Sequence, residues 1–255
     1  MALDAVMLAA LVNEMSSQTD GAVVDRVQQP ASDEIILTLR GRSGGGKLAI
    51  SLSPAFPGIY FTRLKRENPA QPPMFCMLLR KHLQGAKLIS IEQTPGERIV
   101  VLRFSCLSEL GDRVERQLII ELMGRRTNLI LAQEDGLMID CLKRVTPDDP
   151  AGRRLLPGLR YEAPRPMERQ FFVLMGDDDI RQSLEGRLKD GSVIKTLTRM
   201  LAGLSPLAAR QVCALAGVDE DDDCTAADEA ALIEQCIALR NRVLTGRIDI
   251  MISNG

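Results

Sequence analysis

The chain has 255 residues, of which 45% are hydrophobic and 3% aromatic, and it has no Trp, so its cores must consist mainly of aliphatic side chains. Residues 1–170 hold 23 basic and 20 acidic residues, whereas residues 171–255 hold 9 and 14; this excludes a polycationic domain and leaves only local patches for contact with a nucleic acid. No apolar run reaches the ~18 residues of a membrane span, and the six cysteines form no C-x-x-C pair, so we expect a soluble cytoplasmic protein with reduced thiols, no metal site and no cofactor.

The N-terminal half predicts a mixed, mainly antiparallel α+β domain. An amphipathic helix is expected over residues 2–17, and from residue 22 the apolar residues follow a period of two, which is typical of strands. The expected strands are 34–40, 47–52, 58–62, 87–93, 98–104, 114–122, 128–132 and 137–143. Alternating βαβ units are absent, so a doubly wound nucleotide-binding fold is not expected.

A glycine-rich segment, Gly41-Arg42-Ser43-Gly44-Gly45-Gly46-Lys47, has the composition of a phosphate-binding loop. However, Leu48 follows where Ser or Thr would hold magnesium, and an alternating strand follows instead of a helix. We therefore interpret the segment as a flexible hairpin turn.

A proline-stiffened approach leads into a short helix at residues 73–83, since proline suits the first helical turn. Met74, Met77 and Leu78 recur at i, i+3 and i+4 and predict its buried face. The helix ends in Arg80, Lys81 and His82, the only histidine. From the pattern alone this is a core helix with a solvated basic end; nucleic-acid binding is the other reading.

The segment from Pro147 to Pro166 is rich in Pro, Gly and Arg and predicts a linker or a wrapping segment. A basic run passes through it that could follow a nucleic-acid backbone or could simply be solvated. Its members are Arg153, Arg154, Arg160, Arg165 and Arg169.

Beyond this segment the strand pattern ends and helices are expected. Residues 192–202 and 207–216 predict two short helices around a tight turn, with Ser205 capping the second and Pro206 at its first position. The spacing fits a helix-hairpin-helix that offers turn amides to phosphates, or a packing αα-hairpin. A last helix is expected at 228–244. The acidic run 219–223 lacks the spacing of a calcium loop and predicts a solvated loop.

Five blocks in register give the chain a family resemblance. They are Leu3-Asp4, Val24-Asp25-Arg26-Val27-Gln28-Gln29-Pro30, Asn68–Leu83, Glu97-Arg98-Ile99-Val100 and Glu121-Leu122-Met123-Gly124-Arg125. Together they resemble the N-terminal domain of the NFACT family, the RqcH-type ribosome quality-control factors also known as fibronectin-binding protein A. The resemblance implies an NFACT-N domain over 1–172, similar in fold to the N-terminal domain of formamidopyrimidine-DNA glycosylase, and a helix-hairpin-helix domain over 173–255. It also implies a coiled coil and an RNA-binding domain beyond this chain.

The functional expectations come from the same resemblance. It implies a non-enzymatic factor that binds a large ribosomal subunit obstructed by peptidyl-tRNA and recruits tRNA, chiefly alanine tRNA, for template-free tailing of stalled chains. The family carries an Asp-Arg pair implicated in tRNA handling, with an acidic residue matching Asp4; here the pair is Glu97 and Arg98, with an acid one methylene longer. The expected tRNA-binding residues are Asp4, Glu97, Arg98, Arg125, Arg80, Lys81 and His82.

Two other functions remain as alternatives. A DNA glycosylase would need an N-terminal proline nucleophile, but the chain begins Met1-Ala2-Leu3-Asp4 and shows no zinc finger. A surface adhesin that binds fibronectin is not supported by any signal peptide, anchor or repeat. Because the sequence has one His and no nucleophile motif, we expect no catalytic residue, no small-molecule substrate and no membrane contact.

Overall fold

The computed structural model describes residues 3–19, 21–41, 45–108, 110–146, 153–164, 169–188, 192–219 and 225–246. The chain divides into two compact units. Unit 1 comprises residues 1–3, 14–94 and 98–165, and unit 2 comprises residues 4–13, 95–97 and 166–255. Much of the expected glycine-rich turn and most of the acidic run lie outside the described residues.

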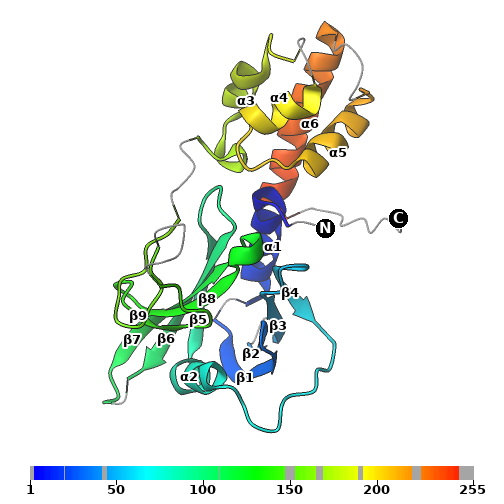
Figure 1. Ribbon diagram of the computed structural model, residues 1–255. Coiled ribbons are helices and arrows are strands. Elements are labelled where there is room, and N and C mark those ends of the chain that lie inside the picture. Colours follow the sequence, from blue (N-terminus) through cyan, green and yellow to red (C-terminus); the bar gives the residue numbers. More distant parts are fainter. Residues whose placement is uncertain are drawn as a thin grey trace. The chain divides into compact units, whose positions relative to one another are not determined.

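Unit 1 contains a nine-stranded antiparallel sheet in the order β4-β3-β2-β1-β5-β6-β7-β8-β9 (Figure 1). This confirms the α+β class and its antiparallel character. The strands are β1 (Val23–Ala31), β2 (Glu34–Arg40), β3 (Gly45–Ser51), β4 (Gly58–Thr62), β5 (Lys87–Gln93), β6 (Ile99–Leu107), β7 (Arg113–Glu121), β8 (Asn128–Gln133) and β9 (Met138–Cys141).

The sheet consists of two half-sheets, β4 to β1 and β5 to β9, that are weakly joined. Strands β1 and β5 pair at Val23 and Lys87, flanked by backbone bonds from Val24 N–H to the Ala86 carbonyl and from Leu88 N–H to the Ala22 carbonyl. Strands β6 and β7, by contrast, pair along their whole length. A side chain adds a further connection: Thr127, 1% exposed, donates its hydroxyl to the carbonyl of Leu52 at 2.6 Å. Thr127 directly precedes β8 and Leu52 directly follows β3, so this bond links the half-sheets.

Thr127→Val is expected to lower the free energy of unfolding by about 1–2 kcal/mol, because valine keeps the shape but leaves the buried Leu52 carbonyl without its donor. Urea denaturation measures the change. Thr62→Val, at the end of the edge strand β4, is the matched control and should stay within about 0.5 kcal/mol of the parent. Equal midpoints for the two variants would show that the Thr127 bond does not hold the half-sheets.

Helix α2 (Met74–Leu83) packs against β1, but not through the predicted face. Its buried residues are Phe75, Cys76, Leu79 and Leu83. Met74 is 90% exposed and Met77 is 51% exposed, so the expected buried face was wrong for both methionines. Cys76 Sγ and Arg80 Nε both donate to the Val27 carbonyl of β1. These contacts orient the helix with its methionines outward.

The described part of the basic segment after β9 wraps the sheet. Residues 153–161 are therefore a wrapping segment and not a linker. Leu155, 2% exposed, exchanges backbone hydrogen bonds with Val145, and Met138 N–H donates to the Leu159 carbonyl. Residues 153–161, named here the strap, cover a hydrophobic cluster on one sheet face. That cluster includes Ile99, Ile119, Ile130, Met138 and Leu155.

Unit 2 is helical in its described part. Its elements are the start of α1 (Ala5–Thr19), η2 (Phe172–Leu174), α3 (Asp177–Leu184), α4 (Val193–Met200), α5 (Pro206–Ala216) and α6 (Ala226–Leu244). Their shared core includes Phe172, Ile180, Leu197, Val212 and Leu232. Ser205 caps α5 as predicted, accepting from Ala208 N–H at 3.1 Å. No described helix combines the length and apolarity needed to cross a membrane.

Candidate nucleic-acid interface

The Glu97-Arg98 pair lies in the turn between β5 and β6. The turn is closed by Thr94 N–H, which donates to the Ile99 carbonyl at 2.9 Å, and Gly96 supplies the positive φ of 76° that the turn requires. Both charged side chains are half-buried, not fully exposed. The Arg98 carbonyl accepts from Leu122 N–H at 2.8 Å. This bond fixes the backbone of Arg98 to the end of β7.

A short turn with two arginines lies at the same end of the sheet. Because Ile99 pairs with Glu121, the residues after β7 start beside Arg98. They form η1 (Gly124–Arg126), where Gly124 has a φ of 56° and the side chain of Arg126 is exposed. The side chain of Arg125 lies outside the described part. The structure thus brings the Glu97-Arg98 turn and η1 together at one sheet end.

Asp4 stabilises the N-terminus of α1. Its Oδ1 accepts from Met7 N–H at 2.7 Å, so the carboxylate caps the start of α1. This cap explains why α1 begins at Ala5 and not at residue 2, the predicted start. Asp4 and Glu97 both belong to unit 2, whereas Arg98 belongs to unit 1.

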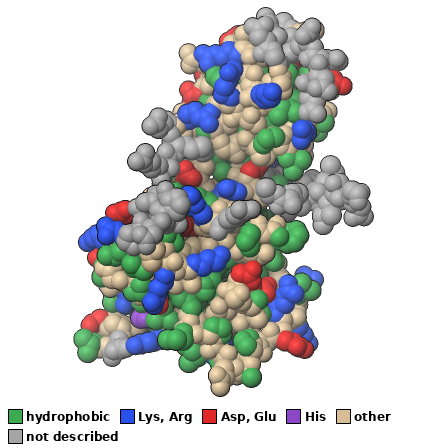
Figure 2. All heavy atoms as spheres, in the orientation of Figure 1, with side chains coloured by type: hydrophobic (Ala, Val, Ile, Leu, Met, Phe, Trp, Pro, Cys, Tyr) green, Lys and Arg blue, Asp and Glu red, His purple; other side chains and the backbone are tan. Residues whose placement is uncertain are grey.

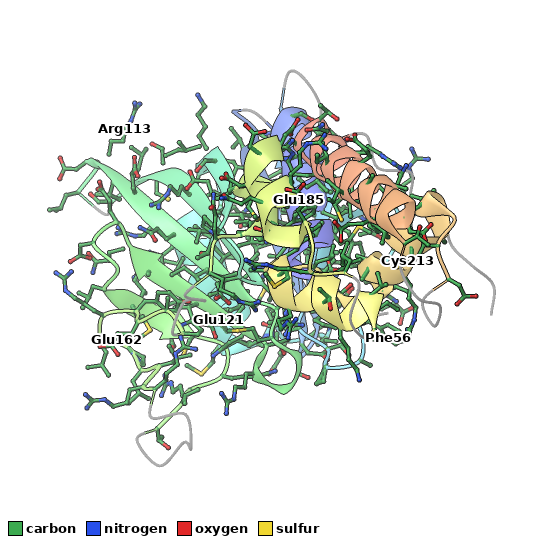
Figure 3. The ribbon with its side chains drawn as sticks, turned by 90° about the horizontal axis from the view of Figure 1, so that it is seen from above. Phe56, Arg113, Glu121, Glu162, Glu185 and Cys213 are labelled. Atoms are coloured by element: carbon green, nitrogen blue, oxygen red, sulfur yellow. The ribbon has the colours of Figure 1, made fainter. Side chains whose placement is uncertain are left out.

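Lys81 and His82 lie at the other end of β6. From Ile99 to Leu107 a strand of this kind spans ~27 Å, and Leu107 lines the same pocket as Lys81 and His82. Figure 3 labels Arg113 and Glu121, the first and last residues of β7, at its two ends. The predicted set therefore divides between two ends of the sheet.

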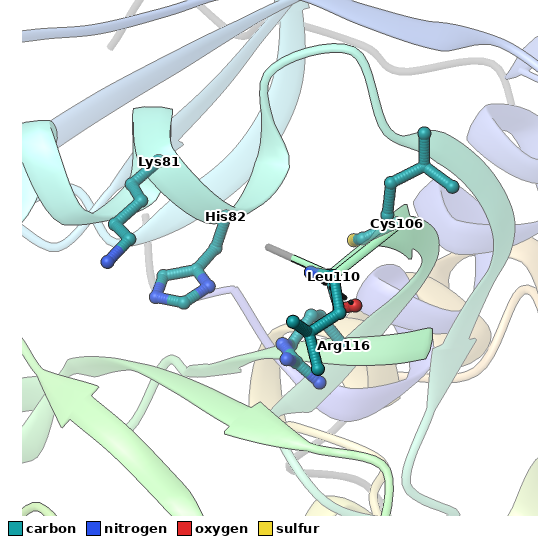
Figure 4. Close-up of a pocket in the computed structure, with 7 residues that line it drawn as sticks. Lys81, His82, Cys106, Leu110 and Arg116 are labelled. Atoms are coloured by element: carbon teal, nitrogen blue, oxygen red, sulfur yellow. Dashed lines mark hydrogen bonds between the residues drawn. The ribbon is translucent and has the colours of Figure 1, made fainter. Parts of the chain in front are cut away.

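The pocket beside Lys81 and His82 has a volume of about 500 Å³ (Figure 4). It is named here the hairpin pocket, and its lining residues are Lys81, His82, Cys106, Leu107, Ser108, Leu110 and Arg116. Arg116 donates from one terminal nitrogen to the Glu115 carbonyl at 2.9 Å. Its Nε is buried with no hydrogen-bond partner among the described atoms. The sequence did not predict a role for Arg116, because a single arginine within a strand gives no local signal.

Arg80 does not join Lys81 and His82 in the pocket lining. Its Nε donates to the Val27 carbonyl at 2.9 Å, and a terminal nitrogen contacts Met77 Sδ at 3.8 Å. The side chain therefore fastens α2 to β1.

The described arginines of the strap and its neighbourhood are mostly engaged within the protein. Arg153 pairs with the buried Glu121 at 2.7 Å, Arg160 contacts Asp135, and Arg169 donates to the Arg199 carbonyl. Arg154 is exposed, and Arg165 lies outside the described residues. These contacts therefore do not leave a continuous basic track along the described part of this segment.

The described residues show no group of three or more potential metal ligands among His, Cys, Asp and Glu. Burial raises the pKa of Cys106 and of Cys141 to about 11, and that of Cys236 to about 12. These thiols are protonated at neutral pH, which disfavours nucleophilic or metal-binding roles.

Lys and Arg side chains are scattered over the face in Figure 2 and do not form one broad field. The surface therefore offers only local groups of polar side chains for contact with a nucleic acid.

Comparisons with known proteins identify the family of this chain. A family model described as NFACT N-terminal and middle domains matches residues 4–253. The chain is 32% identical over 219 residues to the Rqc2 homolog RqcH of Bacillus subtilis (strain 168), covering 86% of this chain and 38% of that protein. It is 37% identical over 186 residues to the Rqc2 homolog RqcH of Streptococcus pneumoniae serotype 2, covering 72% and 34%. The chain thus spans less than two-fifths of either relative.

A solved structure has a similar fold. It is the N-terminal part of the fibronectin/fibrinogen-binding protein FBPS from Streptococcus suis, with a TM-score of 0.81 and 26% identity. The similarity covers 94% of this chain and 84% of that one.

Proposed function

The chain belongs to the family of NFACT N-terminal and middle domains, and from this premise we propose that it is the RNA-contacting N-terminal part of a cytoplasmic ribosome quality-control factor. In this proposal the factor binds large ribosomal subunits that hold peptidyl-tRNA. It brings in tRNA, chiefly alanine tRNA, for template-free extension of stalled chains. Peptide-bond chemistry stays with the ribosome, and this chain acts by positioning, without being an enzyme.

The observation that carries the proposal is the meeting of the Glu97-Arg98 turn with η1 at one end of the sheet. The planar guanidinium of Arg98 suits phosphate oxygens or base edges, and a neighbouring carboxylate can orient it or accept from a base amine. Gly124 has no Cβ, so an RNA backbone can approach η1 closely. Recognition of exposed bases and RNA shape suits a protein without a broad basic field.

The proposed contact residues lie in different parts of the structure. Arg98 is the centre, with Glu97 beside it in the chain and Arg125 in η1. Asp4 is a separate proposal, because its carboxylate caps α1 in unit 2. Lys81 and His82 would be reached only by an RNA that spans the ~27 Å length of β6, and Arg80 supports α2.

The remaining assignments belong to the same proposal. The NFACT-N domain would occupy 1–172, and residues 173–255 would form a helix-hairpin-helix domain with α4 and α5 as its helices. Within the hairpin, Leu204 N–H and Ala208 N–H already have internal acceptors. A phosphate would therefore have to use the other turn amides.

Arg98→Ala is expected to weaken binding of alanine tRNA about tenfold, the cost of removing one charge-assisted contact of about 1.4 kcal/mol. The melting temperature should stay close to that of the parent, since the Arg98 side chain makes no hydrogen bond with the residues that the structure describes. Fluorescence anisotropy with labelled tRNA over a salt series measures both affinity and the number of phosphate contacts.

Arg113→Ala is the matched control, because it removes the same charge from an exposed position at the other end of β7. It should change the affinity less than twofold. A second tRNA and a DNA duplex test specificity. If Arg98→Ala and Arg113→Ala weaken binding equally, generic attraction explains the affinity and the assignment of Arg98 fails.

Fibronectin binding is the second candidate, because the similar Streptococcus suis protein is described as a fibronectin/fibrinogen-binding protein. Immobilised fibronectin in the same experiment separates the two. Saturable fibronectin binding together with salt-sensitive, non-selective tRNA binding would favour the adhesin function.

A further inference from the structure

Lys143, which follows β9, is held in place by a buried side chain. Asn128 is the first residue of β8 and is 2% exposed. Its Nδ2 donates to the Lys143 carbonyl at 2.7 Å, and its Oδ1 accepts from the Lys143 N–H at 2.9 Å. Because one buried amide satisfies both backbone polar groups of Lys143, the lysine side chain starts from a fixed point at this end of the sheet.

The ammonium of Lys143 is only partly engaged within the protein. Lys143 is exposed, and its Nζ donates to Thr127 Oγ1 at 3.2 Å. An ammonium group has three protons to donate, so two remain for an acceptor outside the protein. Thr127 directly follows η1, and the ammonium therefore lies beside η1.

The strand register places Lys143 at the same end of the sheet as Arg98. Ile99 pairs with Glu121, and Glu121 pairs with Asn128. Neighbouring strands lie ~4.8 Å apart, so Ile99 and Asn128 are ~10 Å apart and Lys143 lies one strand further on. Because η1 connects β7 to β8, it lies between the strand of Arg98 and the position of Lys143.

The turn η1 adds a second available cation and open space. Arg126 is exposed, and its guanidinium makes no hydrogen bond or ion pair with the residues that the structure describes. A Cβ added to Gly124 would meet no atom within 4 Å, so the space beside η1 is open. The carboxylates of Glu121 and Asp140, on neighbouring strands, have arginine partners of their own. These acids therefore do not neutralise the cations at η1.

These groups favour RNA phosphates over a protein partner. Phosphate oxygens accept hydrogen bonds from Lys and Arg, and such contacts fix the orientation of a nucleic acid without reading its sequence. The centre of a protein interface instead buries large apolar side chains. Among the described residues between 122 and 146, no large hydrophobic side chain is exposed.

We propose that Lys143 and Arg126 bind phosphates of the RNA that contacts Arg98, and that Asn128 is a positioning residue for Lys143. The cation row, defined as Arg98, Arg126 and Lys143, extends ~14 Å along one end of the sheet. The RNA backbone crosses this end from β6 to β9 over η1. This inference rests on the proposed function and adds the path of the RNA beyond Arg98.

The test measures the binding of alanine tRNA and of a second tRNA to Lys143→Met by fluorescence anisotropy over a salt series. The variant should weaken binding of both tRNAs about fivefold and to the same extent, because a phosphate contact carries no sequence information. The slope of log affinity against log salt should become shallower by about 1, which corresponds to one lost phosphate contact. Arg126→Gln should have a similar effect.

Lys87→Met is the matched control. Lys87 is an exposed lysine that pairs with Ser105, at the opposite end of β6 from Ile99. Its substitution removes the same charge and should leave both the affinity and the salt slope unchanged.

Asn128→Ala tests the positioning role through a double-mutant cycle. It should weaken tRNA binding in the parent but add little to Lys143→Met, because both changes remove the same contact. A merely structural role of Asn128 would weaken binding equally in both backgrounds. If Asn128→Ala does not fold, the comparison of Lys143→Met with Lys87→Met still decides the proposal.

Arg98→Ala is measured beside these variants to separate this inference from the proposed function. Weaker binding by Arg98→Ala, with unchanged affinity and salt slope in Lys143→Met, overturns the cation row and leaves the proposed function standing. Equal losses from Lys143→Met and Lys87→Met also overturn the cation row, because generic attraction would explain them. If neither Arg98→Ala nor Lys143→Met weakens binding, both proposals fail.

Discussion

Arg153→Leu is expected to lower the free energy of unfolding by about 3 kcal/mol, because it leaves a buried carboxylate without its partner. Glu121 is 1% exposed and accepts two hydrogen bonds from Arg153, at 2.7 and 3.3 Å. Tyr161 donates a third at 2.8 Å, and the guanidinium lies 5.8 Å from the Tyr161 ring centre. Burial opposes the charge on Arg153, but pairing with Glu121 raises its pKa, so it stays charged.

Urea denaturation of the parent and variant measures the loss. Arg160→Leu is the control, because its ion pair with Asp135 is solvent-exposed on both sides and such pairs contribute at most about 1 kcal/mol. The double variant Glu121→Leu/Arg153→Leu removes both charges and should recover part of the loss, since apolar pairs replace buried ion pairs at little cost. A loss no larger than that of Arg160→Leu would show that the pair is not effectively buried.

This ion pair connects stability to the proposed RNA contact. Glu121 is the last residue of β7, pairs with Ile99 and precedes the Leu122 amide that holds the Arg98 carbonyl. Arg153 also donates to the Glu162 carbonyl at 2.6 Å, so the same guanidinium fastens the strap. The strap thus braces the end of the sheet that carries Arg98 and η1.

Much of the fold was predictable because its signals are local. Period-two patterns located most strands, and Ser205 with Pro206 located the start of α5. Strand β1 was missed as a defined element, since its polar residues and Pro30 hide the alternation. A register shift between Gln28 and Ala31 accommodates that proline. Helix α3 was also missed, because its eight residues begin with three aspartates.

The errors arose where tertiary contacts decide the outcome. Periodicity placed Met74 and Met77 inside, but Phe75, Leu79 and Leu83 form an equally regular stripe, and packing against β1 selects that one. The basic run through Arg153 and Arg160 looked uniform in sequence, yet each arginine has its own acidic partner. The hairpin pocket joins α2 to a hairpin about 30 residues away, and no short-range pattern reports such a meeting.

Gly203→Ala is expected to lower the free energy of unfolding of the helical unit by about 3 kcal/mol, from backbone strain and overpacking together. Gly203 has a φ of 91° in the turn between α4 and α5, a conformation that disfavours L side chains. A Cβ there would lie 2.5 Å from Cε2 and 2.7 Å from Cδ2 of Phe171. Phe171 is 6% exposed, so its ring cannot move aside without disturbing the core.

Gly217→Ala separates the two causes, because Gly217 has a φ of 72° after α5 but nothing within 4 Å of an added Cβ. It should cost only about 1 kcal/mol of backbone strain. The difference between the two variants, measured by urea denaturation followed through helical circular dichroism, gives the cost of the contact with Phe171. Adding Phe171→Leu to Gly203→Ala should recover part of that difference by making room for the methyl group. Equal losses for both glycine variants would mean that Phe171 does not close this turn. In that case the turn of the proposed helix-hairpin-helix would owe its glycine to backbone conformation alone.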